Sequence, residues 1–218
     1  MHRVVRPIIS AALASTVIAR SASSPRRCLS QGPSPQQRAK LDALPRYFAH
    51  ADALMREGKV NEARKAMEDA VSACRENKDA LATASALSML ARIHISNDEV
   101  RSAFPLLHEA MELREKAQGR DNEDFARDTA TLAYVWWQLC ELDKAEALFR
   151  DSIALYTQTV GTDHASMAIA QYNLAGVLYE QGRKDEATQL GREALRVFTL
   201  VLGPDHSRTR EARDNFGG

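Results

Sequence analysis

The sequence predicts an all-α fold, an α-solenoid in which antiparallel helix pairs stack as a superhelix of about four repeats plus a short C-terminal cap. Three observations predict it. Columns of residues recur every 42 positions, small residues in those columns have the spacing of closely packed helix pairs, and only 10 Gly and 7 Pro occur among 218 residues. Such a low content of turn residues argues against an all-β chain of this length.

The 42-residue step is kept by five columns without a slip. Gly119, Gly161 and Gly203 form one of them. The others are Asp121, Asp163 and Asp205; Leu90-Ala91, Leu132-Ala133 and Leu174-Ala175; Ala103, Ala145 and Ala187; and Leu106, Leu148 and Leu190. A shorter copy comes first, since Ala63 precedes Ala103 by a slightly smaller step. Self-similarity at a fixed period is the signature of a repeat architecture, so we expect four repeats.

Each column has a physical role. The alanines let two antiparallel helices approach closely, and leucine and aromatic side chains fill the space beside them. The adjacent Trp136 and Trp137 point about 100° apart on a helix, so only one of them is expected in the core. The repeat alignment assigns Trp136 to the core and predicts that Trp137 is half exposed or covered by a partner.

Glycine and aspartate separate one repeat from the next. The glycines at 119, 161 and 203 are expected to end helices in the left-handed conformation. The Asp two residues later is expected to accept hydrogen bonds from the first N–H groups of the next helix. His164 and His206 follow two of these Asp residues, but Asn122 follows the third. The pattern therefore indicates a polar turn and no metal site, and no cofactor is expected.

The repeat domain is expected at 44–206, with a C-terminal cap or tail at 207–218 that has almost no apolar face. The repeats are predicted at about 44–77, 79–118, 123–160 and 165–202. Their helices are predicted at about 44–57 and 60–77, 79–96 and 99–117, 123–139 and 143–159, and 165–181 and 184–202.

The first residues have the composition of a mitochondrial targeting presequence. Five Arg and no Asp or Glu occur between Met1 and Ser30, which leaves 24 basic and 29 acidic residues in the remainder. The stretch Arg27-Cys28-Leu29-Ser30 resembles a matrix processing site, so we expect a presequence at 1–29 and a flexible leader at 30–43. The expected location is the matrix or the matrix face of the inner membrane. A secretory signal and a disordered tail are the alternatives.

Several function classes find no support in the sequence. Three Cys lie in no metal or redox motif, and no phosphate-binding loop, paired metal histidines or nucleophile elbow occurs, so the chain is not expected to be an enzyme. The net charge of −5 after the presequence argues against nucleic acid as a partner. The apolar run from Ile8 to Ala19 is too short for a stable membrane span, which needs about 20 residues.

The stretch from Asn173 to Ala187, closing with Leu202-Gly203-Pro204-Asp205-His206, resembles the 42-residue tetratricopeptide (TPR) repeat of kinesin light chains. That family's unit runs approximately Asn-Asn-Leu-Ala-x-Leu-Tyr-x-x-Gln-Gly-(Arg/Lys)-Tyr-x-Glu-Ala and ends in Leu-Gly-x-Asp-His-Pro. The match covers about 45–205 and is closest in the fourth repeat. This chain departs from the family where Tyr172 replaces the first Asn and where Ala165 and Ser207 replace the Pro. These 218 residues do not contain a long heptad coiled coil of the kind that a kinesin light chain has.

The resemblance implies that the first helix of each pair lines a concave groove that binds a protein or peptide. The ligand-facing positions of the family correspond to Ser88, Met89, Arg92, Arg127, Thr131, Tyr134, Trp137, Tyr172, Asn173 and Tyr179. Asn173 matches a family Asn that hydrogen-bonds a peptide backbone. The arginines are expected to bind carboxylates, and the aromatic residues to supply flat apolar area. Packing of these residues against neighbouring repeats is the alternative.

These expectations combine into a protein interaction scaffold in mitochondria, an assembly factor or accessory subunit of a large complex, with a respiratory complex as the first choice. An RNA-binding or mitoribosome-associated repeat protein and a cytosolic adaptor similar to kinesin light chains are the alternatives. An RNA-binding helical repeat is expected to have a period near 35 and a positive charge, and this chain has neither.

Overall fold

The computed structural model describes residues 44–217, which form nine α-helices and no strand. The predicted presequence and leader lie outside the described residues. The helices are α2 Leu44–Arg56, α3 Val60–Glu76, α4 Ala80–Ser96, α5 Val100–Gln118, α6 Glu123–Gln138, α7 Leu142–Thr159, α8 Ala165–Glu180, α9 Lys184–Leu202 and α10 Ser207–Phe216. The eight helices predicted in the repeats are confirmed to within one residue at each end.

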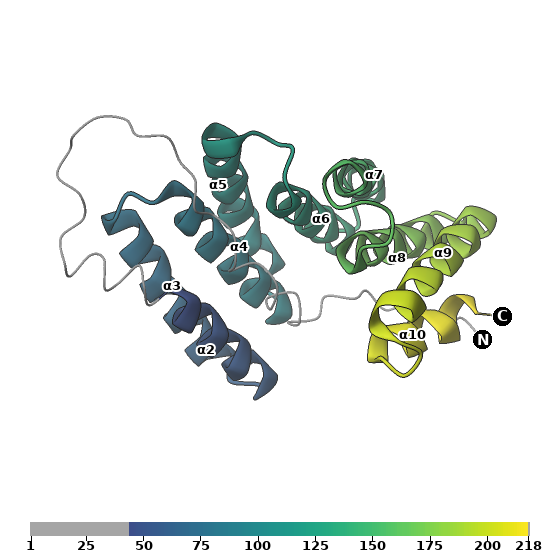
Figure 1. The fold of residues 1–218 in the computed structure, drawn as a ribbon, viewed down its shortest axis with the longest axis horizontal. Coiled ribbons are helices and arrows are strands. Elements are labelled where there is room, and N and C mark those ends of the chain that lie inside the picture. The colour runs from purple at the N-terminus through teal and green to yellow at the C-terminus, as the bar shows by residue number, and fades with distance from the viewer. Residues whose placement is uncertain (1–43, 218) are drawn as a thin grey trace. The chain divides into compact units, whose positions relative to one another are not determined.

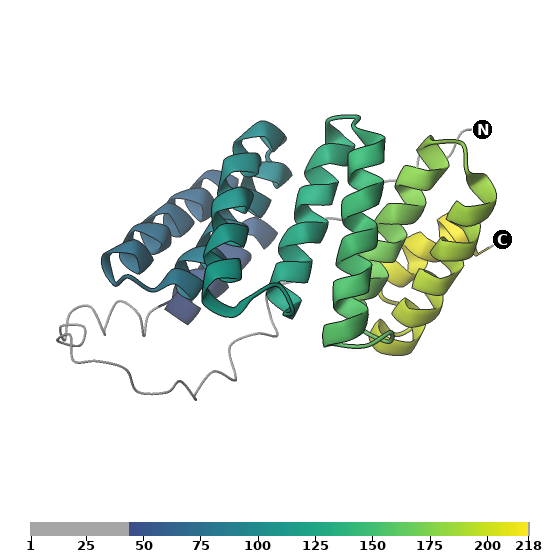
Figure 2. The same ribbon diagram turned by 90° about the horizontal axis from the view of Figure 1, so that it is seen from above.

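The described helices fall into an N-terminal unit, 44–117, and a C-terminal unit, 118–217. Within the N-terminal unit, α3 packs against both α2 and α4, and Arg114 of α5 donates a hydrogen bond to Ser85 of α4. Within the C-terminal unit, α6 pairs with α7, α8 pairs with α9, and α7 also contacts α8 (Figures 1 and 2). The paired arrangement confirms an all-α repeat fold.

The small residues predicted at the helix crossings are confirmed as core. Ala63, Ala103, Ala145 and Ala187 on the second helices are fully buried, and so are Ala91, Ala133 and Ala175 on the first helices. Alanine is required there because a larger side chain would push the two helices apart. In the N-terminal unit, Ala63 joins a cluster of buried residues that includes Met67, Leu87 and Ile93.

In the C-terminal unit the core consists of large aromatic and aliphatic side chains. Phe149, Tyr156, Phe198, Leu174 and Leu178 are each at most 1% exposed. Burying one such side chain stabilises the fold by about 1.5–3 kcal/mol. On the first helices, Leu132, Leu174 and Leu178 are buried as predicted, whereas Trp136, which was predicted to lie in the same buried face, is partly exposed.

The helix ends confirm one prediction and correct another. Gly119, Gly161 and Gly203 have the predicted positive φ, at 79°, 85° and 89°, but the ψ of 163° at Gly203 lies outside the left-handed helical region. The capping residue is not the predicted Asp, however, but the residue after it. His164 Nδ1 accepts a hydrogen bond from the backbone N–H of Ser166, and His206 and Asn122 accept in the same way at α10 and α6.

The reason for this correction is the point at which the extended backbone turns into the helix. A side chain caps a helix from the last non-helical residue, because only there does it face the free N–H groups of the first turn. His164 occupies that residue, with φ −110° and ψ 135°. Asp163 lies one residue too early and binds Arg196 of α9 instead, at 2.8 Å. The two histidines are thus helix caps.

The predicted C-terminal cap is the helix α10, and it packs on α9. Its apolar face is larger than the sequence suggested, since Ala212 and Phe216 are buried. Phe216 occupies the space of a missing side chain at Gly191, where a Cβ atom would lie 2.3 Å from the phenyl ring. The outward side of α10 carries Arg210 and Arg213, both exposed. A polar outer side is what a terminal repeat needs for solubility.

Candidate functional site

The ten residues predicted to face a partner lie on the first helices α4, α6 and α8. The structure buries six of them, Ser88, Met89, Tyr134, Trp137, Tyr172 and Asn173. The other four are partly exposed, namely Arg92, Arg127, Thr131 and Tyr179. The surface that the first helices present is therefore less open than the sequence suggested, and each unit has to be described by its own contacts.

In the N-terminal unit, Ser88 and Met89 belong to the packed interior. Met89 is 4% exposed and lies in the core cluster. The hydroxyl of Ser88 donates to the backbone carbonyl of Ala84 one turn earlier at 2.9 Å, so its hydrogen-bonding capacity is used within α4. Arg92, one turn further along α4, is partly exposed and is the basic residue of this surface.

Asp52 on α2 is a functional candidate that reasoning from the sequence missed. The residue is 9% exposed, and its Oδ1 atom accepts no hydrogen bond from the described residues. Burial raises the pKa of this carboxyl, and the charges of Arg92 and Arg56 lower it by less. A buried polar atom left without a partner costs about 1–3 kcal/mol. Asp52 therefore weakens the fold and is poised to accept a hydrogen bond from a ligand.

Register is the signal that could have found Asp52. Asp52 precedes Ala63 by the same interval at which Arg92, Tyr134 and Gly176 precede the matching alanines of the later repeats. One position of the repeat thus carries an acid, a base, an aromatic ring and a glycine. The first repeat is two residues shorter than the others, so its helix was not aligned with them.

In the C-terminal unit, Arg127 is held by acidic residues of its own helix. Its Nη1 donates to Asp124 at 2.7 Å and its Nη2 to Glu123 at 3.0 Å, and the side chain is 16% exposed. Burial lowers the pKa of the guanidinium, but the charges of Asp124, Tyr156 and Glu123 and a hydrogen bond to Glu123 outweigh burial and raise it. A partner carboxylate would have to compete with two carboxylates already in place.

Trp137 is buried, which contradicts the prediction that it is half exposed. The side chain is 5% exposed and lies edge-on to Tyr134 and Phe149, with ring centroids 6.0 Å and 6.5 Å away. Its six-membered ring fills the space above Gly176 of α8, where a Cβ atom would lie 2.4 Å from Cη2. The absence of a side chain at Gly176 therefore admits the indole between α6 and α8.

Trp136 is the partly exposed tryptophan, so the repeat alignment assigned the two rings the wrong way round. The ammonium of Lys144 lies 4.4 Å from the centroid of the Trp136 ring, a cation–π contact of the kind found at protein surfaces. The alignment failed because it compared Trp136 with the leucine column and did not include the glycine on the neighbouring helix that receives Trp137.

Tyr172 and Asn173 are covered in this structure. Tyr172 is fully buried, and its ring lies edge-on to Phe216 of α10 with centroids 5.7 Å apart. Its hydroxyl accepts a hydrogen bond from Asn215 and lies 3.5 Å from a Glu211 carboxylate oxygen. Burial and the charge of Glu211 raise the pKa of this phenol. The C-terminal helix thus occupies the position at which we expected a partner to contact Tyr172.

Thr131 and Tyr179 keep part of their surface. The Thr131 hydroxyl donates to the backbone carbonyl of Arg127 at 2.8 Å, and the residue is partly exposed. Lys184 lies 5.9 Å from the centroid of the Tyr179 ring. The accessible members of the predicted set are thus a hydroxyl, a phenol and two arginines, a composition typical of protein interfaces.

Two negative findings apply to the part of the chain that the structure describes. No three His, Cys, Asp or Glu side chains in 44–217 are grouped closely enough to hold a metal ion. Among the described helices, none combines the length and the apolar character needed to cross a membrane.

The similarity to known proteins agrees with this geometry. Sequence profiles described as tetratricopeptide repeat match residues 44–77, 83–124, 124–199 and 166–218. A comparison with curated protein sequences gives no match.

Three solved structures have a similar fold. BtubC (BKLC) from P. vanneervenii is 21% identical with a TM-score of 0.61, and the alignment covers 72% of this chain and 64% of that one. A Podosopora anserina chain with nearly identical TPR-like repeats, assigned as a kinesin light chain, is 19% identical with a TM-score of 0.60 and 83% coverage of both chains. A point variant of that protein gives 19% identity, 83% coverage of both chains and a TM-score of 0.61. The chain belongs to the tetratricopeptide repeat family.

Proposed function

We propose that the chain is a non-catalytic scaffold in mitochondria and binds a protein partner through its first helices. In this proposal it serves as an assembly factor or accessory subunit of a large complex, and the kind of complex that we propose is a respiratory one. Tetratricopeptide repeats are protein interaction modules, which supports the general role. The Arg-rich, acid-free start of the sequence supports import.

The observation that carries the proposal is the buried carboxylate of Asp52. A position that serves packing alone would be filled by an apolar side chain, as Ala51 and Leu54 are on the same helix. Asp52 instead keeps a polar atom that has no partner among the described residues, at a cost in stability, and the partly exposed Arg92 of α4 is close enough to lower its pKa. A protein segment that offers N–H donors would satisfy the carboxylate of Asp52.

The test uses the full chain and one matched pair of variants. Asp52→Asn removes the charge at the candidate site, and Asp69→Asn removes an exposed acid from α3. Affinity purification from isolated mitochondria, followed by mass spectrometry and blue-native electrophoresis, identifies partners. We expect Asp52→Asn to lose a partner that wild type and Asp69→Asn retain, while its melting temperature is not lowered.

Three outcomes would contradict the proposal. If Asp52→Asn recovers every partner as well as wild type does, the surface around Asp52 does not bind the partner. Recovery with ribosomal RNA would favour a mitoribosome-associated function. A cytosolic location in cell fractionation, or a mature protein that still begins at Met1, would refute import, whereas N-terminal sequencing that starts at Ser30 supports it.

A further inference from the structure

Each unit carries one three-residue polar element where a second helix meets the turn of the following helix pair, and we call this element a clasp. In the N-terminal unit it consists of Arg64 on α3 and Glu99 and Asn97 in the turn between α4 and α5. Arg64 Nη1 lies 3.4 Å from each carboxylate oxygen of Glu99. Asn97 Nδ2 donates to Glu99, and His94 Nδ1 contacts Glu99 at 2.6 Å.

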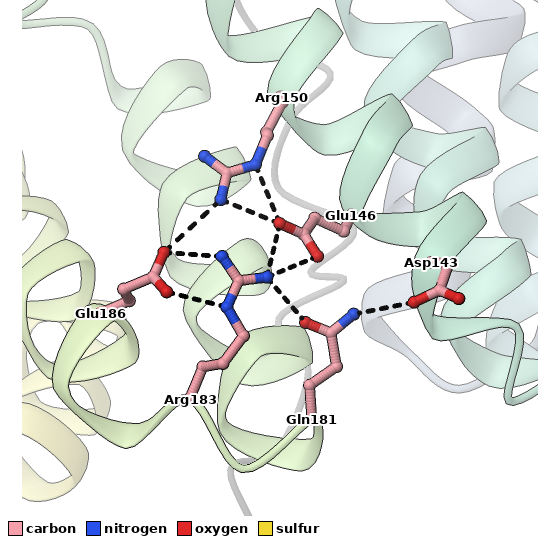
Figure 3. A network of polar contacts seen from close by, with 6 residues as sticks. All are labelled: Asp143, Glu146, Arg150, Gln181, Arg183 and Glu186. Carbon is pink, nitrogen blue, oxygen red and sulfur yellow. Dashed lines mark hydrogen bonds and ion pairs between the residues drawn. The ribbon is translucent and has the colours of Figure 1, made fainter.

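In the C-terminal unit the clasp consists of Glu146 on α7 and Arg183 and Gln181 in the turn between α8 and α9 (Figure 3). Arg183 Nη1 lies 2.8 Å from both carboxylate oxygens of Glu146. Gln181 Oε1 accepts a hydrogen bond from the same nitrogen at 3.2 Å. Arg150 and Glu186 extend the network, because Arg150 binds Glu146 at 2.8 Å and Arg183 binds Glu186 at 2.7 Å.

The two clasps occupy equivalent positions with opposite polarity. Arg64 and Glu146 each follow the buried alanine of their second helix, and Glu99 and Arg183 each lie four residues before the next such alanine. The basic residue is on the helix in one unit and in the turn in the other. Two residues before the charged residue of each turn lies an amide side chain, which can either donate or accept a hydrogen bond. Which of the two it does depends on the sign of that charge. Asn97 donates to an acid, and Gln181 accepts from a base.

Charge adds to the distinction between repeats because part of the apolar contact is the same in all of them. The crossing residues are alanine in every repeat, and the leucine columns recur at the same step. A second helix that met the wrong turn could therefore keep its alanine and leucine contacts, although the aromatic contacts would differ. Such an error would place Arg64 against Arg183, or Glu146 against Glu99, and like charges at this distance repel.

We propose that the two clasps of opposite polarity determine which repeat stacks on which, and that they suppress misassembly within the chain and exchange of repeats between two copies. From the second repeat to the third, the positions equivalent to the clasp residues carry Phe104, Leu139 and Glu141. This set differs from both clasps. Each step along the repeats thus has its own set of residues. Exchange of identical elements is the characteristic error of repeat proteins, which is why such a device is useful.

A purely stabilising role makes a different prediction. Partly exposed ion pairs contribute about 0–1 kcal/mol each, so a clasp adds little to total stability. If stability were its only role, a clasp of reversed polarity with the same geometry would serve equally well. If the clasps select partners, the polarity of one has to differ from that of the other.

The experiment therefore makes the two clasps alike and then different again. A four-residue variant, E146R/R150E/R183E/E186R, gives the C-terminal unit the polarity of the N-terminal one while its local pairs are kept. A six-residue variant adds R64E/E99R and restores opposite polarity. A control, E112K/K116E, reverses an exposed pair within α5. Each full chain is unfolded in urea and refolded, and size-exclusion chromatography with light scattering measures the fraction that regains native size.

We expect the four-residue variant to regain native size at least threefold less often than wild type, and the six-residue variant and the control to refold like wild type. Efficient refolding of the four-residue variant overturns the proposal. Equal failure of the four- and six-residue variants also overturns it, because local disruption would then explain the loss. The single variant E146R is expected to lower the melting temperature by about 2–4 °C. The absence of any shift would show that the clasp makes no stabilising contact and would overturn the proposal.

Discussion

Replacing Gly176 by alanine tests how the first helices of the C-terminal unit are packed. Gly176 lies inside α8, where alanine is normally the better residue by about 1 kcal/mol. Helix propensity alone therefore predicts that Gly176→Ala stabilises the protein. The structure predicts the opposite, because the new methyl group would lie 2.4 Å from Cη2 and 2.8 Å from Cζ2 of Trp137.

The size of the effect follows from how little room the indole has. Trp137 is 5% exposed and is bounded by Tyr134 and Phe149, so it cannot move aside without disturbing two other rings. Overpacking of a closed core site costs about 1–3 kcal/mol. After the gain in helix propensity is subtracted, we expect a net loss of up to about 2 kcal/mol. For a chain of this length that loss lowers the melting temperature by up to about 8 °C.

Thermal unfolding followed by circular dichroism and tryptophan fluorescence measures the effect. A second variant, Trp137→Leu, removes the collision and supplies a double-mutant cycle. We expect Gly176→Ala to be destabilising in wild type and neutral or stabilising in the Trp137→Leu background, with a coupling energy above about 1 kcal/mol. If Gly176→Ala raises the melting temperature of wild type, the packing of Trp137 against α8 is wrong.

Three further predictions concern single residues. Cys140 is exposed and has a φ of 61°, and two other repeats have glycine at this position. Cys140→Gly should therefore raise the free energy of unfolding by about 0.5–1 kcal/mol, measured by urea unfolding. A lower free energy of unfolding would contradict the argument from backbone conformation. Asp52 has a raised pKa in the folded state, so its stabilising contribution is complete below its ordinary value of 3.8 and is lost as pH rises through the folded value. Asp52→Asn should therefore exceed wild type in melting temperature at pH 7 and match it at low pH, and a constant difference would refute the burial effect. His164→Ala should lower stability by about 1 kcal/mol through the lost cap of α8, whereas His164→Asn should not, and thermal unfolding of both distinguishes capping from packing.

The helices and their order could be predicted from the sequence because they depend on local and periodic signals. The alanine columns, the leucine stripes and the left-handed glycines each have one physical role in a stack of helix pairs, and that role repeats at a constant step. Gly161 and Ala145 illustrate this, since their conformation and burial followed from their place in the repeat. Boundaries were accurate for a related reason, because a residue with positive φ follows each of the helices α2 to α9 within two residues, and in five of these eight cases that residue is glycine.

The candidate site was harder to predict because exposure depends on neighbours that a repeat alignment does not include. Tyr172 occupies a position at which related repeats bind ligands, yet Phe216 of α10 covers it. Arg127 was expected to be available, but acids three and four residues earlier on its own helix neutralise it. Asp52 was missed because the first repeat is two residues shorter and its helix was not aligned with the others.

By itself the sequence determined that this protein is built of four helix pairs, because a buried small residue recurs at each crossing and a terminal glycine ends three of the four repeats. Only the tertiary structure decided which side chains of the first helices remain exposed to solvent. Whether Trp137 lies in the core depends on the missing side chain of Gly176, which belongs to the first helix of the following pair. Packing of this kind is a property of two surfaces in contact, and no periodicity within one helix contains it.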